Sequence, residues 1–169
     1  HFRRHMTSGP VPKRFLESSC LFHTNSDNKK TYDHAEDRQT AWNTESFYDY
    51  IGFKIENMPF EEVKNLWATY GNSGPLFVFL GHTDVVPTGP LDNWRNDPFS
   101  PSEENGFLFG RGAADMKGSV AAFVTAIENF ISENKQFNGR IGLLLTSDEE
   151  GPSINGVKKV IQELEKRKE

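Results

Sequence analysis

The sequence of 169 residues has the length of a single domain, with 25% charged and 36% hydrophobic residues. Its formal net charge of −5 gives no sign of a nucleic-acid partner or of an acidic membrane surface as a partner. No apolar run approaches the roughly 20 residues that a membrane span requires. The single cysteine, Cys20, excludes an internal disulfide and fits a reducing compartment. These properties predict a soluble, cytoplasmic protein.

Residues 1–46 differ in composition from the rest of the chain. They contain four of the five histidines and show no sustained apolar periodicity. A segment that cannot bury enough apolar surface tends to stay disordered, so we expect a leader or tag-like segment ahead of a domain over residues 47–169. Cys20, His23 and His34 lack the second closely spaced ligand pair of a zinc site, which argues against a metal cluster there.

The regular part of the chain begins with two strand patterns, at residues 53–58 and 65–70, and the turn residues 71–74 close the second one. An unbroken apolar run, 76–80, then predicts a strand that is buried on both faces. The stretch 87–105 is rich in proline and glycine, which indicates a loop.

Strands and helices alternate after this loop. Residues 106–109 form a short predicted strand, and the spacing of apolar residues predicts an amphipathic helix over about 120–133. A further buried strand is predicted over 140–146, followed by a second helical pattern over 154–164 that frays at 165–169. This alternation predicts an α/β fold with a central, mostly parallel sheet flanked by helices.

Three polar clusters follow these apolar segments: His82 with Asp84, then Asp115, and then the acidic run 148–150. Ligands of open α/β sheets bind outside the carboxyl ends of the strands, so parallel strands would gather the clusters at one edge. His82 and Asp84 would share a face of an extended chain, where a carboxylate can orient a metal-ligating imidazole. One imidazole with several carboxylates suits a hydrolytic site for zinc or another divalent ion.

Each cluster also has a plain structural interpretation. The first can be a strand that ends in polar loop residues, and the third a solvated acidic surface. Asp115 can cap the following helix or pair with Lys117. Neighbouring glutamates at a strand end face opposite ways, so one of Glu149 and Glu150 can ligate metal while the other accepts a proton. The pattern G-x-G-x-x-D from Gly110 does not fit a dinucleotide loop, because its acid would oppose a pyrophosphate.

Four segments of the sequence carry longer motifs: GHTDVVPTG (81–89), the spacing of Trp94 to Pro98 and Phe99, LFGRGAADMKGS (108–119) and LLLTSDEEG (143–151). Together they resemble the succinyl-diaminopimelate desuccinylases, the lysine-pathway members of the dinuclear zinc aminoacylase and carboxypeptidase-like family. The resemblance runs from about Ile51 to Glu169. Acetylornithine deacetylases share the cores of these motifs, but RGAAD and TSDEE are closer to the desuccinylase pattern.

The resemblance implies a zinc-peptidase-like catalytic domain whose complete site holds two zinc ions, with cobalt as an alternative metal. His82, Asp115 and Glu150 would ligate metal, Asp115 bridging the two ions, and Asp84 would orient His82. Glu149 would be the general base and acid that takes a proton from the attacking water and later protonates the leaving amine.

The implied reaction is the hydrolysis of N-succinyl-L,L-2,6-diaminopimelate to succinate and L,L-diaminopimelate, a step of diaminopimelate and lysine biosynthesis. A related N-acyl amino acid deacylase of the acetylornithine deacetylase type, or a dipeptidase, is the alternative within the class. The alternative outside it is a non-catalytic truncated fragment.

The chain also departs from the family pattern. The family takes one more carboxylate and one more histidine ligand from segments that lie beyond Glu169, and the domain through which full-length members form homodimers comes after that point too. Residues 1–46 do not resemble the family's opening helices, although 50–53 resumes its pattern. We therefore expect the first half of a catalytic domain behind a foreign leader, with little or no hydrolase activity of its own.

Overall fold

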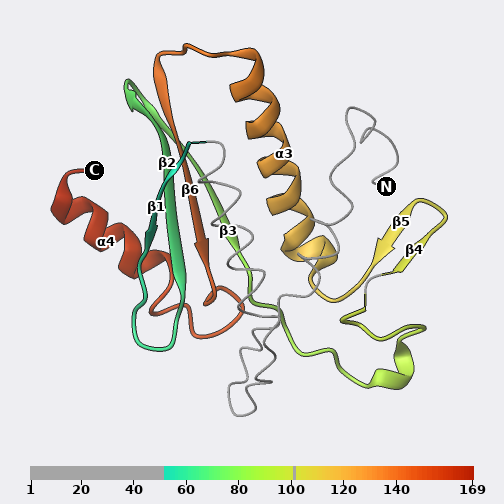
Figure 1. Ribbon diagram of the computed structural model, residues 1–169. Coiled ribbons are helices and arrows are strands. Elements are labelled where there is room, and N and C mark those ends of the chain that lie inside the picture. Colours follow the sequence, from blue (N-terminus) through green and yellow to red (C-terminus); the bar gives the residue numbers. More distant parts are fainter. Residues whose placement is uncertain (1–51, 101) are drawn as a thin grey trace.

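The computed structural model describes residues 52–100 and 102–169, which form a four-stranded sheet between two helices, with an arm at one side (Figure 1). The segment 1–46 and the expected boundary at residue 47 lie outside the described residues, and so do Cys20 and the histidines near it. In the described part of the chain, no helix is long and apolar enough to cross a membrane.

The sheet has the strand order β1-β2-β6-β3. β1 and β2 are antiparallel neighbours in a hairpin, and β2 also runs antiparallel to β6. β3 and β6 are parallel, because the helix α3 (Gly118–Glu133) lies between them in the chain and returns it to the same end of the sheet. The strands are Lys54–Asn57 (β1), Asn65–Ser73 (β2), Leu76–His82 (β3) and Gly139–Thr146 (β6).

The predicted α/β class is confirmed, but the expectation of a mostly parallel sheet is wrong. Of the strand pairs in the described sheet, β3–β6 is parallel and the other two are antiparallel. The alternation of strand and helix that predicts parallel pairing begins only at β3. β1 and β2 are joined by the short connection 58–64, which is long enough for a hairpin and too short for a crossover.

The two helices cover opposite faces of the sheet (Figure 1). Side chains of β6 alternate between them, as the period of a strand requires. Ile141, Leu143 and Leu145 belong to the core cluster beneath α3, whereas Leu144 packs with Val160 of α4 (Val157–Arg167). β6 is therefore the centre of the core, and packing on both faces fixes its carboxyl end.

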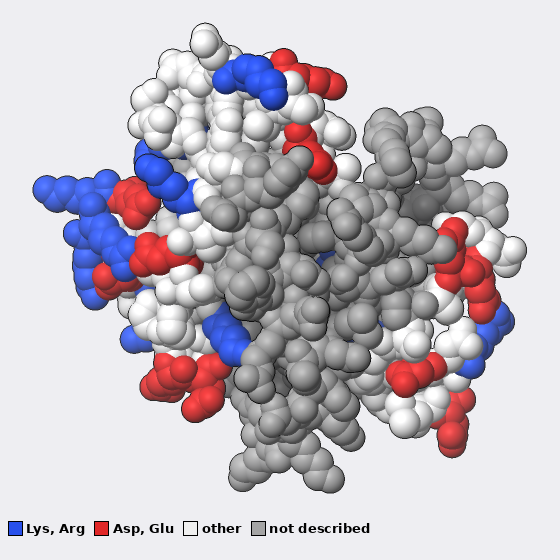
Figure 2. All heavy atoms as spheres, in the orientation of Figure 1, with Lys and Arg blue, Asp and Glu red and all other residues white. Residues whose placement is uncertain are grey.

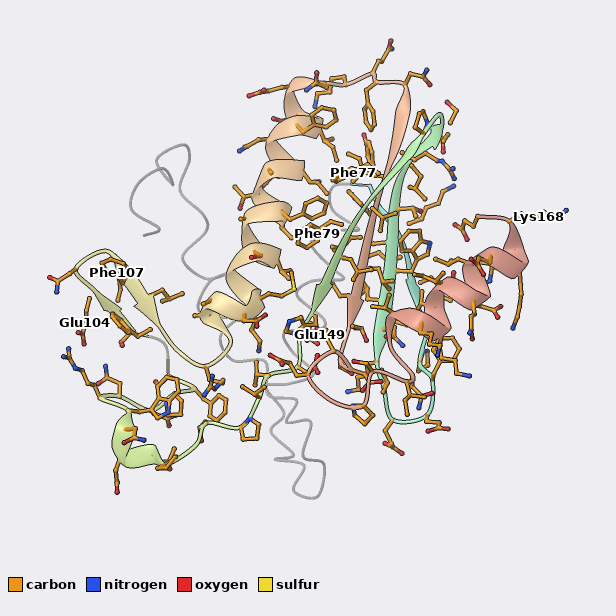
Figure 3. All side chains as sticks on the ribbon, turned by 180° about the vertical axis from the view of Figure 1, so that it is seen from behind. Phe77, Phe79, Glu104, Phe107, Glu149 and Lys168 are labelled. Atoms are coloured by element: carbon orange, nitrogen blue, oxygen red, sulfur yellow. The ribbon has the colours of Figure 1, made fainter. Side chains whose placement is uncertain are left out.

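The middle of β3 is less covered than its apolar sequence predicts. Phe77, Val78 and Leu80 are 64%, 40% and 45% exposed, although Phe79 stacks on an aromatic ring of α3 (Figure 3). β3 is the last strand of the described sheet and pairs there only with β6, so the expectation of burial on both faces is wrong for these residues. The end of the strand is different, because His82 is buried.

Residues 85–100 and 102–110 form the arm beside the sheet (Figure 1). The arm contains a 3₁₀ turn, Leu91–Asn93, and a small antiparallel hairpin of β4 (Ser102–Glu104) and β5 (Phe107–Phe109). The predicted strand at 106–109 is therefore confirmed. Its partner β4 falls in the predicted loop, because a strand of three residues is too short to show an alternating pattern.

Both predicted helices are present, and the second has different ends. α4 begins after Ile154, whose backbone N–H donates to Asp148 and whose side chain is 58% exposed. α4 then continues to Arg167 instead of fraying at residue 165, and Arg167 pairs with Glu56 at 2.7 Å. Figure 2 shows acidic and basic side chains interspersed at the side of the molecule where α4 lies.

Candidate metal centre

The carboxyl ends of β3 and β6 lie side by side, because the strands are parallel and pair His82 with Thr146. The backbone N–H of Thr83 donates to the carbonyl of Thr146 at 2.8 Å, so the chain leaving β3 stays against the end of β6. Figure 3 shows Glu149 at this end of the sheet. The structure thus brings the first and third predicted clusters together at one edge, as their positions after strands predict.

The buried side chain of Asp84 connects the two strand ends. Its Oδ2 accepts hydrogen bonds from the backbone N–H groups of Glu149 at 3.0 Å and Glu150 at 2.8 Å. Charge-assisted bonds of this kind hold the donating peptides in one orientation. The sequence predicts a role for Asp84 beside His82, but it gives no sign of these bonds, which join residues 65 and 66 positions apart.

His82 is held at one ring nitrogen and exposes the other to carboxylates. Its Nδ1 lies 3.0 Å from the backbone carbonyl oxygen of Asp84 and 3.6 Å from the Asp84 Oδ1. The ring therefore bonds to the carbonyl, and the carboxylate that the sequence predicts as acceptor of its N–H lies just beyond hydrogen-bond distance. The Nε2 lies 3.1 Å from Asp115 Oδ1 and 3.7 Å from Glu149 Oε2.

The charges around the ring change its pKa and those of its neighbours. The Asp84 carboxylate, opposed by burial and assisted by Asp115, raises the pKa of His82 from 6.5 to about 9. Burial alone would raise the pKa of Asp84, but the His82 ring and the N–H groups of Glu150 and Glu149 outweigh it and hold that pKa below its ordinary value. Burial and the charge of Asp115 raise the pKa of Glu150. Without a metal, the site therefore favours a positive charge at His82.

Three of these side chains form a group that can hold a metal ion. One ligand atom each of His82, Glu149 and Glu150 lies within 4.8 Å of the others. Asp115, predicted as a ligand, touches His82 but stands outside this tight group, and its side chain is 77% exposed. Glu149, predicted as the base, lies inside it. An imidazole nitrogen with several carboxylate oxygens is a donor set that suits Zn²⁺ and similar ions.

Asp115 comes from the segment Ala113–Lys117, directly before α3. The residue at the cap position of α3 is Lys117, and no side chain makes a capping hydrogen bond there. The alternative in which Asp115 caps the helix is therefore wrong. Asp115 instead extends from this segment to His82.

Asp148 does not join the cluster that its sequence neighbours form. It is 7% exposed, and its carboxylate accepts the backbone N–H groups of Ser153, Ile154 and Asn155 at 3.1, 2.8 and 2.9 Å. The sequence places Asp148 in one acidic run with Glu149 and Glu150, whereas the structure directs it into the loop after them.

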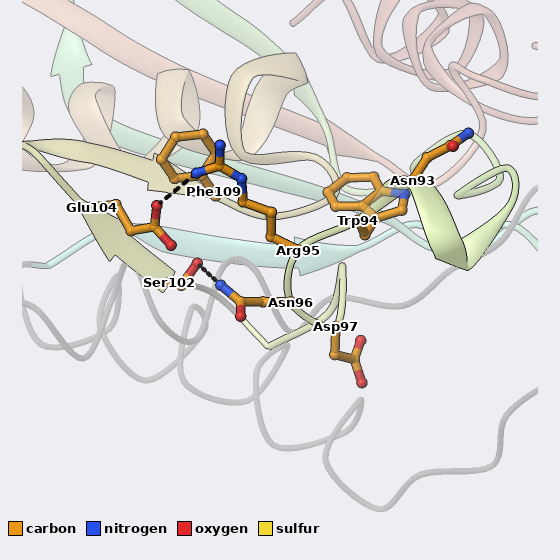
Figure 4. Close-up of a pocket in the computed structure, with 9 residues that line it drawn as sticks. Asn93, Trp94, Arg95, Asn96, Asp97, Ser102, Glu104 and Phe109 are labelled. Carbon is orange, nitrogen blue, oxygen red and sulfur yellow. Dashed lines mark hydrogen bonds and ion pairs between the residues drawn. The ribbon is translucent and has the colours of Figure 1, made fainter.

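The arm contains a separate pocket of about 370 Å³, and none of the predicted site residues lines it (Figure 4). Arg95 and Glu104 lie 3.4 Å apart across it, and Asn96 donates to Ser102 at 2.9 Å. Contacts between its own lining residues hold this pocket together, and the predicted site residues lie elsewhere, at the strand ends.

Residues 78–169 match the model of the peptidase family M20/M25/M40. The chain belongs to this family. Two curated relatives are succinyl-diaminopimelate desuccinylases: that of Acinetobacter baylyi is 59% identical over 118 residues, and that of Nitrosomonas eutropha 57% identical over 119 residues. Each match covers 70% of this chain and 31% or 32% of the relative, so the chain spans about a third of their length. The resemblance drawn from the motifs is confirmed.

Two solved structures share the fold. The M20 family metallo-carboxypeptidase Sso-CP2 of Sulfolobus solfataricus superposes with a TM-score of 0.75 and 25% identity, over 90% of this chain and 34% of that one. Human carnosine dipeptidase 1 superposes with a TM-score of 0.70 and 22% identity, over 91% of this chain and 35% of that one. Together with the group around His82, membership of this family supports a metal cofactor.

We expect the His82 ring of the metal-free chain to titrate with a pKa of about 9. The folded chain then binds this proton more tightly than the unfolded chain, so its stabilising effect is complete below pH 6.5 and is lost as the pH rises through 9. An NMR titration of the imidazole measures this, with His82→Gln to assign the signal. In Asp84→Asn the His82 pKa should fall, because the largest raising influence is removed. A pKa near 6.5 in the unsubstituted chain would contradict the geometry.

Proposed function

We propose that this chain provides metal ligands and the proton-transferring glutamate of an amide hydrolase that acts on N-succinyl-L,L-2,6-diaminopimelate. The products are succinate and L,L-diaminopimelate. The observation that carries the proposal is the contact of the His82 Nε2 with carboxylates from two other segments, Asp115 and Glu149. The identity of 56–59% to proteins named succinyl-diaminopimelate desuccinylase supports this substrate over the acyl groups of other deacylases.

The residues present fit a metal ion. The His82 Nε2 faces carboxylates while its Nδ1 is already engaged, which is how proteins orient an imidazole ligand. We propose that His82, Asp115 and Glu150 hold the metal, with zinc as the ion, two ions in the complete site and cobalt as a substitute. When bound, such an ion polarises the amide carbonyl and lowers the pKa of a water molecule.

Glu149 is the residue that we propose to move protons. Its side chain is 53% exposed, so both water and a substrate amide can reach its carboxylate, while Asp84 holds its backbone. The carboxylate takes a proton from water as the oxygen attacks the amide carbon, and it gives that proton to the nitrogen as the C–N bond breaks. Asp84 orients the His82 ring through its carbonyl and keeps Glu149 within reach of the ring.

The proposed reaction also indicates the pathway and the compartment of the protein. Release of L,L-diaminopimelate would place the reaction in diaminopimelate and lysine biosynthesis, and the single cysteine of the sequence fits a reducing, cytoplasmic location. The substrate is a small molecule, and we expect the complete enzyme to be a homodimer.

We predict that His82→Ala reduces the zinc affinity of the chain at least about 100-fold, because the imidazole ligand is lost. Glu149→Gln should keep the zinc affinity within a few-fold of the unsubstituted chain. Elemental analysis after dialysis and competition with a chromophoric chelator measure both. His34→Ala is the matched control, since it removes a histidine outside the proposed centre. An unchanged zinc content in His82→Ala would count against the assignment.

The substrate is tested in a chimaera with a curated relative. We predict that the A. baylyi desuccinylase, with its 118 matched residues replaced by those of this chain, hydrolyses N-succinyl-L,L-diaminopimelate in preference to N-acetylornithine. Glu149→Gln in this chimaera should lower kcat by about 10² to 10⁴, because the general base is removed. Release of succinate and of acetate by the two substrates measures the preference. A folded, zinc-loaded chimaera that prefers N-acetylornithine would refute the proposed substrate.

A further inference from the structure

Asp148 closes the loop that carries the two glutamates of the metal centre. Its carboxylate accepts three backbone N–H groups, those of Ser153, Ile154 and Asn155, so the loop turns around a single buried side chain. Within this turn the Ser153 hydroxyl donates to the carbonyl of Glu149 at 2.8 Å. The peptide of Glu149 is therefore tied directly to the part of the loop that Asp148 organises.

Asn65 fixes the far end of the same loop to the sheet. Its side-chain Nδ2 donates to the carbonyl of Asn155 at 3.0 Å and to the carbonyl of Met58 at 3.0 Å. Asn65 is 2% exposed and is the first residue of β2. It pairs across the sheet with Thr146, the last residue of β6. Asn155 is thus held from both sides, by Asp148 at its N–H and by Asn65 at its carbonyl.

The side chains of the two glutamates depend on these backbone contacts for their position. The side chain of Glu149 is 53% exposed and Glu150 is half-buried, so packing does not hold either of them against His82. Their N–H groups are bound by Asp84 on one side, and the loop that continues from them is closed by Asp148 on the other. The position of the carboxylates relative to the ring is therefore set by the backbone.

We propose that Asp148 and Asn65 are positioning residues of the metal centre, which set Glu150 at the distance from His82 that metal binding requires and Glu149 at the distance that proton transfer requires. This inference rests on the proposed function, because it assumes that the centre binds a metal. Neither residue touches the metal or the substrate. Both act through the peptide backbone of the loop 148–155.

The chemistry of the contacts identifies the substitutions that test the proposal. In Asp148→Asn, one oxygen becomes an NH₂ group, so a donor faces at least one of the three N–H groups that need an acceptor. In Asn65→Asp, a carboxylate faces the two carbonyl oxygens that accept hydrogen bonds from Nδ2 in the unsubstituted chain. Ser153→Ala is a mild third variant at an exposed residue, and it removes only the bond to the Glu149 carbonyl.

We expect Asp148→Asn and Asn65→Asp to weaken zinc binding by about 10- to 100-fold, which is the usual effect of changing residues that orient metal ligands. Ser153→Ala should weaken it by about 2- to 10-fold, the effect of one hydrogen bond. The visible absorption spectrum of the cobalt-loaded chain should change in the first two variants, because the glutamates move relative to the ion. Competition with a chelator gives the affinities, with the full chain used throughout.

Ile131→Ala is the matched control for a purely structural effect. Ile131 is buried near the end of α3, outside β6 and the loop, and its side chain has no polar contact to offer. This variant should lower the thermal midpoint and leave the zinc affinity and the cobalt spectrum unchanged.

The results separate the two claims. If His82→Ala retains the zinc affinity of the unsubstituted chain, the proposed metal centre itself is wrong. If His82→Ala loses zinc while Asp148→Asn, Asn65→Asp and Ser153→Ala keep the affinity and the cobalt spectrum, the centre stands and the positioning role is overturned. If the first two variants do not fold, Ser153→Ala decides, and an unchanged affinity in it overturns the proposal.

Discussion

The carboxylate of Asp84 lies buried between the ends of β3 and β6, and the arrangement of the centre depends on it. Burying a carboxylate is costly unless hydrogen bonds and opposite charge compensate. Here the N–H groups of Glu149 and Glu150 and the ring of His82 provide that compensation. The compensation has a geometric consequence, because the groups that stabilise the charge are those that carry the candidate ligands. The contacts that stabilise the buried carboxylate therefore also hold the parts of the site together.

The topology of the sheet places Asp84 close enough to the two glutamates to accept their N–H groups. The crossover through α3 returns the chain so that β6 lies parallel to β3, and their carboxyl ends meet in register. Packing of β6 between α3 and α4 then fixes the point at which the loop 148–155 begins. From there two buried carboxylates hold the loop from opposite sides, Asp84 at its first peptides and Asp148 at its last. The glutamates stay accessible to solvent at one end of a rigid frame.

The sequence is sufficient to predict the features that local order determines. Apolar runs ending in polar residues predict that His82, Asp84 and Glu149 meet at one edge, because the carboxyl ends of parallel strands share an edge. The sequence is insufficient where contacts are distant: the bonds from Asp84 to the glutamates and from Asn65 to Asn155 leave no local pattern. The exposure of β3 and the antiparallel pairing of β1, β2 and β6 could not be predicted for the same reason. Both depend on the order of the strands in the sheet, and no single segment of the sequence determines that order.

Anomalous diffraction at the zinc edge, on crystals of the chain grown with zinc, tests the central claim most directly. We predict a peak at about 2.0–2.1 Å from the His82 Nε2, the bond length of zinc to an imidazole nitrogen, with carboxylate oxygens of the same sheet edge around it. Asp84 should still accept the two glutamate N–H groups in that crystal. Zinc bound elsewhere in the chain, with none at His82, would contradict the account.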